Sequence, residues 1–319
     1  MCISVIIPSY NRGWCLEDTV MSASYADNNI VCEILVVDNG SDDNSFEIIE
    51  RLSASDSRIR WVDGSHLPKN GNAARNLGFR ESSGDYIQYL DSDDQIVPGK
   101  LEAQLDWLKK QGSKSITTSQ WVAFTDQDII KKLRKRETWK DYSSGVDLLK
   151  DLLLRNQWFC PGTWLLPRYL CEVVGPWDEA CSADQDRDYF MRLLIEAENV
   201  YCYPEEGFRY RVGSTDHVSN QTDSRHQKSR WLVWQKTRDM LLSVSDASHS
   251  KAAVAQALIH LSYSRFWNDA SYLSEAAESF NSLKAHVPLF SRPYFLGIMS
   301  RLIGLQKAVK IRRKICNFI

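Results

Sequence analysis

The chain has 319 residues, a formal net charge of −2, and 43% hydrophobic and 25% charged residues. These values are typical of a globular protein with one large and one smaller domain, or two of moderate size. They give no indication of nucleic-acid binding, and no window approaches the ~20 apolar residues of a transmembrane helix. The 8 cysteines form no Cys-x-x-Cys pair, which argues against common zinc sites and favours a reducing cytoplasm over a disulfide framework.

The first hundred residues alternate between strand and helix patterns. Apolar runs predict strands at 3–7 and 33–37, and residues suited to strands predict two more at 58–62 and 86–90. Helical spacing predicts a helix with Leu16, Val20 and Ala23, a second from about residue 45 with Phe46, Ile49 and Leu52 inward, and a third at 70–80. Because the chain opens on a strand that Pro8 ends, we expect no signal peptide. The alternation predicts an α/β fold with a mostly parallel, Rossmann-like sheet flanked by helices.

Polar and acidic residues gather in the loops that follow three of these strands, at 8–13, 38–45 and 91–95. Ligands of such sheets bind beyond the carboxyl ends of the strands, so we expect a site there. The first strand is not followed by Gly-x-Gly-x-x-Gly or by a Gly-x-x-x-x-Gly-Lys loop. A dinucleotide oxidoreductase and a P-loop nucleotidase are therefore disfavoured.

The segment Tyr86-Ile87-Gln88-Tyr89-Leu90-Asp91-Ser92-Asp93-Asp94 runs from a strand directly into three carboxylates. Buried carboxylates are costly unless they are paired or bind a cation. Oxygen-rich clusters of this kind suit Mg or Mn, which complete their coordination with water and substrate phosphates. The alternative is an ordinary polar turn at the end of a strand.

Several segments, taken in order, resemble the family 2 glycosyltransferases. They are Val5 to Arg12, Val36 to Asp43, Asn72 to Gly78, Gly84 to Asp94, and downstream Gly175 to Glu179 with Ser182 to Tyr189. The resemblance covers about residues 1 to 220 and fades beyond. It implies a GT-A fold and inverting transfer of a sugar from a nucleotide-activated donor, a UDP-sugar being favoured. The implied acceptor is a hydroxyl of a glycan or of a lipid-linked glycan in cell-envelope polysaccharide biosynthesis.

The same resemblance assigns the donor and metal sites by position. Asp38 is implied to bond the base, and Arg75 to lie near the diphosphate or ribose; a turn acid and a solvated arginine are the alternatives. The implied metal ligands are Asp93, which we favour, with Asp91, Asp94 and His217, although a lone histidine can equally be a loop residue. The residues implied to bind the donor are Pro8, Ser9, Tyr10, Arg12, Asp38, Arg75, Asp91 and Asp93.

The downstream acidic segment is implied to supply the general base. Family members carry Glu-Asp here, where this chain has Gln185-Asp186, so Asp186 inherits the base role and Gln185 an acceptor contact. The neutral amide departs from the pattern and bears on acceptor binding. Acids also favour the first turn of a helix through its dipole, which is the alternative reason for Asp186 and would lower its pKa.

Trp158 and Trp164 lie beside Pro161 and Gly162, which fits either a loop that stacks on sugars or a domain core. The basic cluster at 131–136 is interpreted as a solvated insertion or hairpin; contact with an anionic acceptor or a membrane surface is the alternative.

The predicted domains are a GT-A catalytic domain at 1–220 and a helical region at 221–319. The catalytic domain comprises a nucleotide-sugar half at 1–98 and an acceptor half at 99–220. No acidic residue follows Glu278, while lysine and arginine recur among apolar residues. Such a terminus can pack on its own domain or contact an anionic membrane surface. We therefore expect a cytoplasmic protein that can lie peripherally on the inner face of the membrane, without nucleic-acid partners.

Two other functions remain open from the sequence. A nucleotidyltransferase would need a Gly-rich, Lys-containing loop after the first strand, and residues 8 to 13 contain no lysine. A non-catalytic nucleotide-sugar-binding protein is suggested only by the departure at Gln185.

Overall fold

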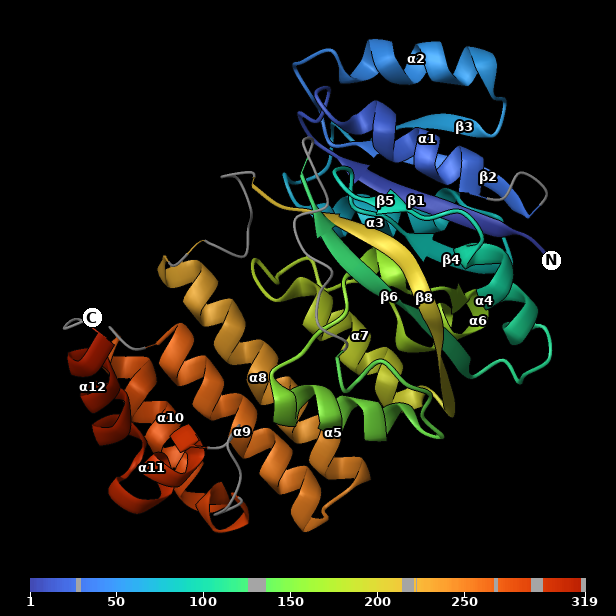
Figure 1. Ribbon diagram of the computed structural model, residues 1–319. Helices are drawn as coiled ribbons and strands as arrows, with labels where there is room; N and C mark the ends of the chain where they lie inside the picture. The colour runs from blue at the N-terminus through green and yellow to red at the C-terminus, as the bar shows by residue number, and fades with distance from the viewer. Residues whose placement is uncertain are drawn as a thin grey trace. The chain divides into compact units, whose positions relative to one another are not determined.

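The computed structural model describes residues 1–26, 30–125, 136–213, 221, 223–266, 269–287 and 295–316 (Figure 1). Its packing divides the chain into two compact units. The first comprises Met1–Gly145, Phe159–Glu179 and Arg192–His217, and the second comprises Val146–Trp158, Ala180–Met191 and Val218–Ile319. Neither unit is one continuous stretch of chain. The predicted domain boundary at residue 220 stays a prediction.

A five-stranded sheet in the order β3-β2-β1-β4-β7 forms the centre of the first unit. Neighbouring strands are parallel except at the edge, where β7 pairs antiparallel to β4. Strands β1, β2 and β4 are buried on both faces, as their largely apolar sequences predict, whereas the outer strand β3 buries only Ile59 fully. Their bounds are β1 Ile3–Ser9, β2 Val31–Asp38, β3 Ile59–Asp63, β4 Tyr86–Tyr89 and β7 Leu166–Pro167.

Three helices connect the parallel strands: α1 (Leu16–Ala26), α2 (Ser45–Ser55) and α3 (Gly71–Glu81). Right-handed crossovers place α1 and α2 together on one face of the sheet. The connection through α3 runs the other way across the sheet, from β3 to β4, and therefore covers the opposite face, where α3 contacts β1 and β2 (Figure 1).

One predicted core residue of α2 is wrong. Phe46 is 44% exposed and packs edge-on against Trp61, while Ile48 takes the inward position with Ile49 and Leu52. Successive residues of a helix are about 100° apart around its axis, so Phe46 lies to one side of the buried face. That face consists of Ser45, Ile48, Ile49 and Leu52.

A second sheet in the order β5-β8-β6 completes the first unit. Strand β8 (Asn199–Arg211) pairs parallel with β6 (Ser115–Phe124) and antiparallel with β5 (Gln95–Ile96). Its length carries its last residues to the acidic loop after β4. The remaining elements of this part are α4 Lys100–Leu108, the short helix η1 Pro161–Thr163 and α6 Arg168–Val174.

The second unit is helical. Helix α8 packs beside α9, and α9 beside α10 (Figure 1). Helix α7 belongs to this unit as far as Met191, and α5 from Val146 onwards. In the part of the chain that the structure describes, no helix is both long and apolar enough to cross a membrane. The bounds are α5 Gly145–Arg155, α7 Gln185–Glu196, α8 Ser224–Val244, α9 Ser248–Ser264, α10 Ala270–Leu283, η3 Lys284–His286, α11 Phe295–Ile303 and α12 Leu305–Cys316.

A buried carboxylate fastens the amino-terminal edge of the central sheet. Glu33 on β2 is 6% exposed and accepts hydrogen bonds from the Ser4 hydroxyl (2.6 Å) and the Ser83 N–H (2.6 Å). It also pairs with Arg60 at 3.0 Å. Burial alone would raise the pKa of Glu33, but the hydrogen bonds from Ser4 and Ser83 outweigh it and hold the pKa below its usual value.

We expect Glu33→Gln to lower the free energy of unfolding by about 1–3 kcal/mol at neutral pH, because the amide cannot accept all these bonds. A lowered pKa in the folded state stabilises the protein above the unfolded pKa of about 4.3. The difference from the wild type should therefore shrink as the pH falls through the folded pKa. Urea unfolding over a pH series measures it, with the exposed Glu50→Gln as control. Equal effects of the two substitutions at neutral pH would refute this role.

Candidate functional site

The loops predicted to form a site meet at the carboxyl edge of the central sheet. Ser9 at the end of β1 lies in register with Asp38 at the end of β2. The Leu90 N–H donates to the Ile6 carbonyl, which brings the end of β4 to the same edge. The Asn39 N–H donates to the Ser9 carbonyl at 2.8 Å, so the first two loops are joined directly. The structure thus confirms that these strand ends share one edge.

The polar groups in and around the first two loops differ in exposure and in their hydrogen-bond partners. Ser9 is 3% exposed, and its hydroxyl has no hydrogen-bond partner among the described residues. Both carboxylate oxygens of Asp38 accept from Ser41, as in a turn-capping acid. Tyr10 is exposed, with the Lys69 ammonium 4.3 Å from its ring centre. Lys69, which the sequence did not single out, also donates to the Asn39 and Gly40 carbonyls.

Pro8 lies near the end of β1 and Arg12 in the loop that follows, and both are partly buried. The Arg12 N–H donates to the Ser45 hydroxyl at the start of α2. This bond ties the loop after β1 to the loop after β2, so both loops are held at the sheet edge.

Arg75 on α3 binds the first acid of the 91–94 loop. Its guanidinium lies 2.6 Å from the Asp91 carboxylate, 3.2 Å from the Asn72 side-chain oxygen, and over the ring of Trp177 at 4.5 Å. Arg75 is 8% exposed. The helical segment around Gly71 therefore does bring an arginine to the acidic loop, where it orients Asp91.

Arg211, at the end of β8, holds the other two acids and was missed by the sequence analysis. Its backbone N–H donates to the Asp94 carboxylate (2.8 Å), and its Nε donates to the Asp93 carbonyl (2.7 Å). The guanidinium is 4.5 Å from the centre of the Phe124 ring and 5.4 Å from that of Trp14. The only signal in the sequence is that Arg211 lies within residues 1 to 220, over which the resemblance extends.

Helix α1 secures the middle of the loop from its other side. The Cys15 thiol and the Thr19 hydroxyl both donate to the Ser92 carbonyl, at 3.4 and 3.0 Å. These contacts and Arg211 hold the loop backbone, and Arg75 holds the side chain of Asp91. The acids are therefore held in place by the fold.

The loop carries surplus negative charge. Asp94 is fully buried, and burial together with the charges of Asp93 and Asp91 raises its pKa well above the usual value. Burial and the same acids also raise the pKa of Tyr210. One Asp94 oxygen accepts from Arg211, and the other has no hydrogen-bond partner in the described ranges. Such a set of oxygens favours a cation.

Three asparagines of the α3 region fasten the segment 177–179. The Asn76 amide donates to the Trp177 carbonyl and accepts from the Trp177 N–H. Asn70 and Asn72 donate to the carbonyls of the next residues, Glu179 and Asp178. The helix that positions Arg75 therefore also anchors this downstream segment.

The residues predicted to act on the acceptor side belong to different units of the protein. Trp164 belongs to the first unit, is 1% exposed and packs against Phe159, so it is a core residue and its predicted acceptor contact is not supported. Trp158, Gln185 and Asp186 belong to the second unit and are partly buried. The Gln185 amide donates to the Cys181 carbonyl at 3.2 Å. His217 and the basic cluster at 131–135 lie outside the described residues.

A mostly parallel sheet flanked by helices, with an acidic loop at its carboxyl edge, defines a GT-A-type α/β protein. The chain belongs to glycosyl transferase family 2, because the family model described as "Glycosyl transferase family 2" matches residues 4–174. A relative supports this assignment. The chain is 36% identical over 238 residues to UDP-Glc:alpha-D-GlcNAc-diphosphoundecaprenol beta-1,3-glucosyltransferase WfgD of Escherichia coli. That match covers 72% of this chain and 84% of the relative.

Other relatives match less of the chain. An uncharacterized glycosyltransferase of Haemophilus influenzae is 39% identical over 109 residues, which is 33% of this chain and 42% of that protein. The chain therefore spans less than half the length of this relative. Among solved structures, residues 1–349 of S. aureus TarS in complex with UDP-GlcNAc superpose with a TM-score of 0.75 at 15% identity, covering 98% of this chain and 92% of that one. This likeness concerns the fold.

Proposed function

We propose that the protein is an inverting glycosyltransferase that moves a sugar from a UDP-sugar to a hydroxyl group of a glycan or lipid-linked acceptor. The observation that best supports this proposal is the acidic loop 91–94, which Arg75 and Arg211 hold at the carboxyl edge of the sheet. The UDP-GlcNAc complex of TarS and the UDP-Glc in the name of the WfgD relative support a UDP-linked donor. The diphosphoundecaprenol in the WfgD name supports a lipid-linked acceptor in cell-envelope polysaccharide biosynthesis.

In this proposal the nucleotide-sugar donor binds at the carboxyl edge of the central sheet, in the first unit. The unpartnered Ser9 hydroxyl and the exposed Tyr10 ring offer a hydrogen bond and a stacking face to the nucleoside. Asp38 bonds the uracil by releasing Ser41, and Pro8 and Arg12 complete the wall. Arg75, already aimed at Asp91, lies near the diphosphate.

The acidic loop fits a divalent cation, Mn or Mg, because three carboxyl groups lie within four positions of one loop and oxygen ligands are those that these cations prefer. We assign Asp93 and Asp91 as the ligands; Asp94 mainly holds Arg211 through its buried carboxyl group. When bound, the cation acts as a Lewis acid on the leaving diphosphate. His217 remains a proposed further ligand.

Asp186 serves as the general base. Its carboxylate takes the proton of the acceptor hydroxyl while that oxygen attacks the anomeric carbon from the face opposite the diphosphate. The bond from the anomeric carbon to the diphosphate oxygen breaks, which inverts the configuration and releases UDP. Gln185 hydrogen-bonds the acceptor through its amide.

Calorimetric titration with a UDP-sugar in the presence and absence of Mn tests the donor assignment directly. We expect binding that Mn strengthens, and UDP release that requires an acceptor such as a lipid-diphosphate-linked sugar. A protein that binds no nucleoside diphosphate under either condition would contradict the proposal. Donor binding without hydrolysis or transfer to any of a panel of acceptors would instead identify a non-catalytic binding protein.

We expect Arg211→Lys to weaken Mn binding by about 10- to 100-fold, the usual cost of removing a group that orients metal ligands. Lysine keeps the charge but loses the Nε–H that bonds the Asp93 carbonyl. Calorimetric titration with Mn measures the change. Arg209→Lys on the same strand, whose arginine pairs with Glu206, is the matched control. Unchanged Mn affinity in Arg211→Lys would contradict the orienting role.

We further propose that the basic C-terminal region contacts an anionic membrane surface. In α12, Leu305, Ala308 and Val309 are buried while Lys307 and Lys310 are exposed. Each surface lysine near anionic lipid contributes about 1 kcal/mol.

The double change Lys307→Glu with Lys310→Glu should therefore lower binding to phosphatidylserine vesicles by at least ~10-fold in a sedimentation assay. The exposed Lys110→Glu in the first unit is the control. Equal sedimentation of the double variant and the wild type would exclude this surface.

A further inference from the structure

Lys69 is a charged residue at the proposed donor site to which the proposed function gives no role. It lies in the segment between β3 and α3, and this segment is bonded to the loop after β2. The Gly64 N–H donates to the Asp38 carbonyl (2.8 Å), and the Asn70 N–H donates to the Asn39 side-chain oxygen (3.0 Å). Lys69 is therefore held at the carboxyl edge of the sheet, beside the loop that begins at Asp38.

Main-chain carbonyls fix the ammonium group of Lys69. Its Nζ donates to the carbonyls of Asn39 (2.5 Å) and Gly40 (2.8 Å), the two residues that follow Asp38. Gly40 has a φ of 80°, and a Cβ at this position would lie 2.8 Å from Nζ, so glycine leaves the room that the ammonium occupies. An ammonium has three N–H donors. The third has no hydrogen-bond partner in the part of the chain that the structure describes, so one donor remains for a ligand.

The same ammonium lies over the ring on which the base stacks in the proposed function. Its Nζ is 4.3 Å from the centre of the exposed Tyr10 ring, within the range of a cation–π contact. Aromatic rings prefer to stack with an offset, with their centres about 4.5–7 Å apart. An offset base therefore covers the part of the Tyr10 face beside the ammonium, and its edge meets Nζ.

The order of the strands decides which edge of the base reaches Lys69. Four neighbouring strands run β3-β2-β1-β4, and the acidic loop, which lies at the diphosphate in the proposed function, follows β4. The nucleoside extends from there across β1 and β2, so the part of the base farthest from the ribose faces the segment after β3. In uracil this part is the O4 carbonyl, because C4 lies opposite the N1 atom that carries the ribose. The adjacent N3–H faces Asp38.

We propose that Lys69 selects the nucleobase of the donor by donating a hydrogen bond to the O4 oxygen of uracil. This inference rests on the proposed function, which supplies the UDP-sugar and the contact between Asp38 and the base. Uracil has a donor at N3 and an acceptor at O4, which match a carboxylate beside an ammonium. Cytosine has a lone pair at N3 and an amino group at C4, so in the same position it presents the wrong group to both residues. Lys69 is thus a specificity-determining residue.

Calorimetric titration of the intact chain with UDP and with CDP, in the presence of Mn, tests this role. We expect the wild type to bind UDP at least ~10-fold more tightly than CDP. Lys69→Met removes the donor and should weaken UDP binding by about 10-fold without weakening CDP binding, because only UDP loses a hydrogen bond from a charged group. The preference for UDP should fall by the same factor. Lys69→Arg keeps a charged donor and should retain most of the preference.

The ratio of the two affinities separates base recognition from support of the loop. If Lys69 only supports residues 39 and 40, Lys69→Met should weaken UDP and CDP binding equally, and this result would overturn the inference. Lys69 is exposed, so we expect the variant to be folded, and thermal unfolding checks this. Lys110→Met, at another exposed lysine of the first unit, is the control and should match the wild type with both nucleotides.

The wild type distinguishes failure of this inference from failure of the proposed function. Equal binding of UDP and CDP by the wild type would overturn the selection by Lys69 and leave the transferase proposal in place. Binding of neither nucleotide would contradict the transferase proposal and remove the base site with it. A preference for UDP that is unchanged or larger in Lys69→Met would assign the selection to other residues and overturn the role of Lys69.

Discussion

Asp186→Asn should abolish sugar transfer while leaving donor binding intact. The amide keeps the size and hydrogen-bonding shape of the side chain but cannot accept a proton, and loss of a general base typically costs about 10²- to 10⁴-fold in rate. We expect kcat to fall by this amount and the calorimetric affinity for the UDP-sugar to stay within about twofold of the wild type. The two measurements together separate chemistry from binding.

Asp147→Asn is the matched control for this prediction, because Asp147 also lies in the first turn of a helix of the second unit. If Asp186 only stabilises the helix dipole, both variants should lose a similar 0.3–1 kcal/mol or so of stability and both should keep their activity. Normal turnover in Asp186→Asn would therefore leave the dipole as the explanation and remove the proposed base.

Asp93→Asn should remove the dependence of donor binding on Mn and lower turnover by ~100-fold or more, because Lewis-acid stabilisation of a leaving group is worth several kcal/mol. For Asp94→Asn we expect reduced stability as the main effect, because the buried carboxyl group of Asp94 accepts a hydrogen bond from the Arg211 N–H. Asp91→Asn should weaken metal binding and release Arg75.

Titration with Mn and thermal unfolding of the same three variants distinguish these effects. Asp106→Asn, an exposed acid on α4, provides the control for removal of a negative charge. A variant Asp93→Asn that binds Mn and turns over like the wild type would place the metal elsewhere or remove it from the mechanism.

Much of the central sheet could be predicted from the sequence because its signals are local. Buried parallel strands are continuous apolar runs, and each turn or cap lies beside the element that it ends. For the same reason β1, β2 and β4 were located closely, and the acids at 91–94 were expected at a strand end. Phe46 was misplaced because its apolar character indicated the core, while its angular position set it on the flank of α2.

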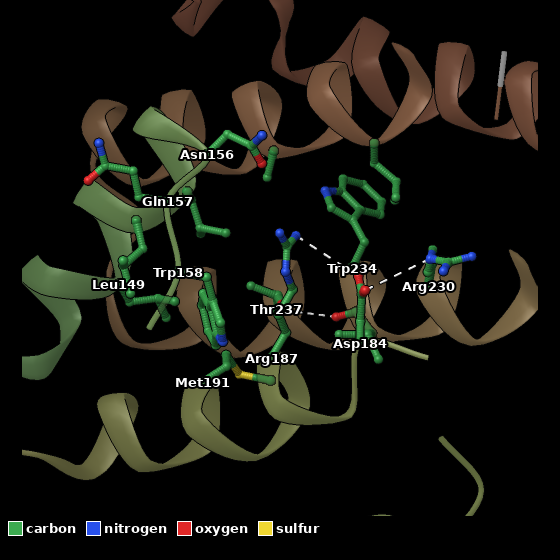
Figure 2. Close-up of a pocket in the computed structure, with 15 residues that line it drawn as sticks. Leu149, Asn156, Gln157, Trp158, Asp184, Arg187, Met191, Arg230, Trp234 and Thr237 are labelled. Carbon is green, nitrogen blue, oxygen red and sulfur yellow. Dashed lines mark hydrogen bonds and ion pairs between the residues drawn. The ribbon is translucent and has the colours of Figure 1, made fainter. Parts of the chain in front are cut away.

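The surroundings of the site were not predictable in this way, because they depend on contacts between distant residues. Nothing near Arg211 in the sequence indicates that it lies against Asp93 and Asp94. Trp164 was left open between core and ligand contact, and in the structure it is buried against Phe159. A pocket of the second unit combines residues of four helices, α5, α7, α8 and α9, with Asp184 and Arg230 brought together across 46 positions of chain (Figure 2).

The way in which the acidic loop is fastened has a consequence for how the protein folds. Ser92 is bonded to residues 73 and 77 positions away, and Asp93 to a residue 118 positions away. Contacts of such long sequence separation form late and slowly, because the loops that they close are costly in entropy. A fragment ending at residue 98 lacks β8 and cannot make them. The loop therefore reaches its final form only after the chain has been synthesised and folded as far as Arg211.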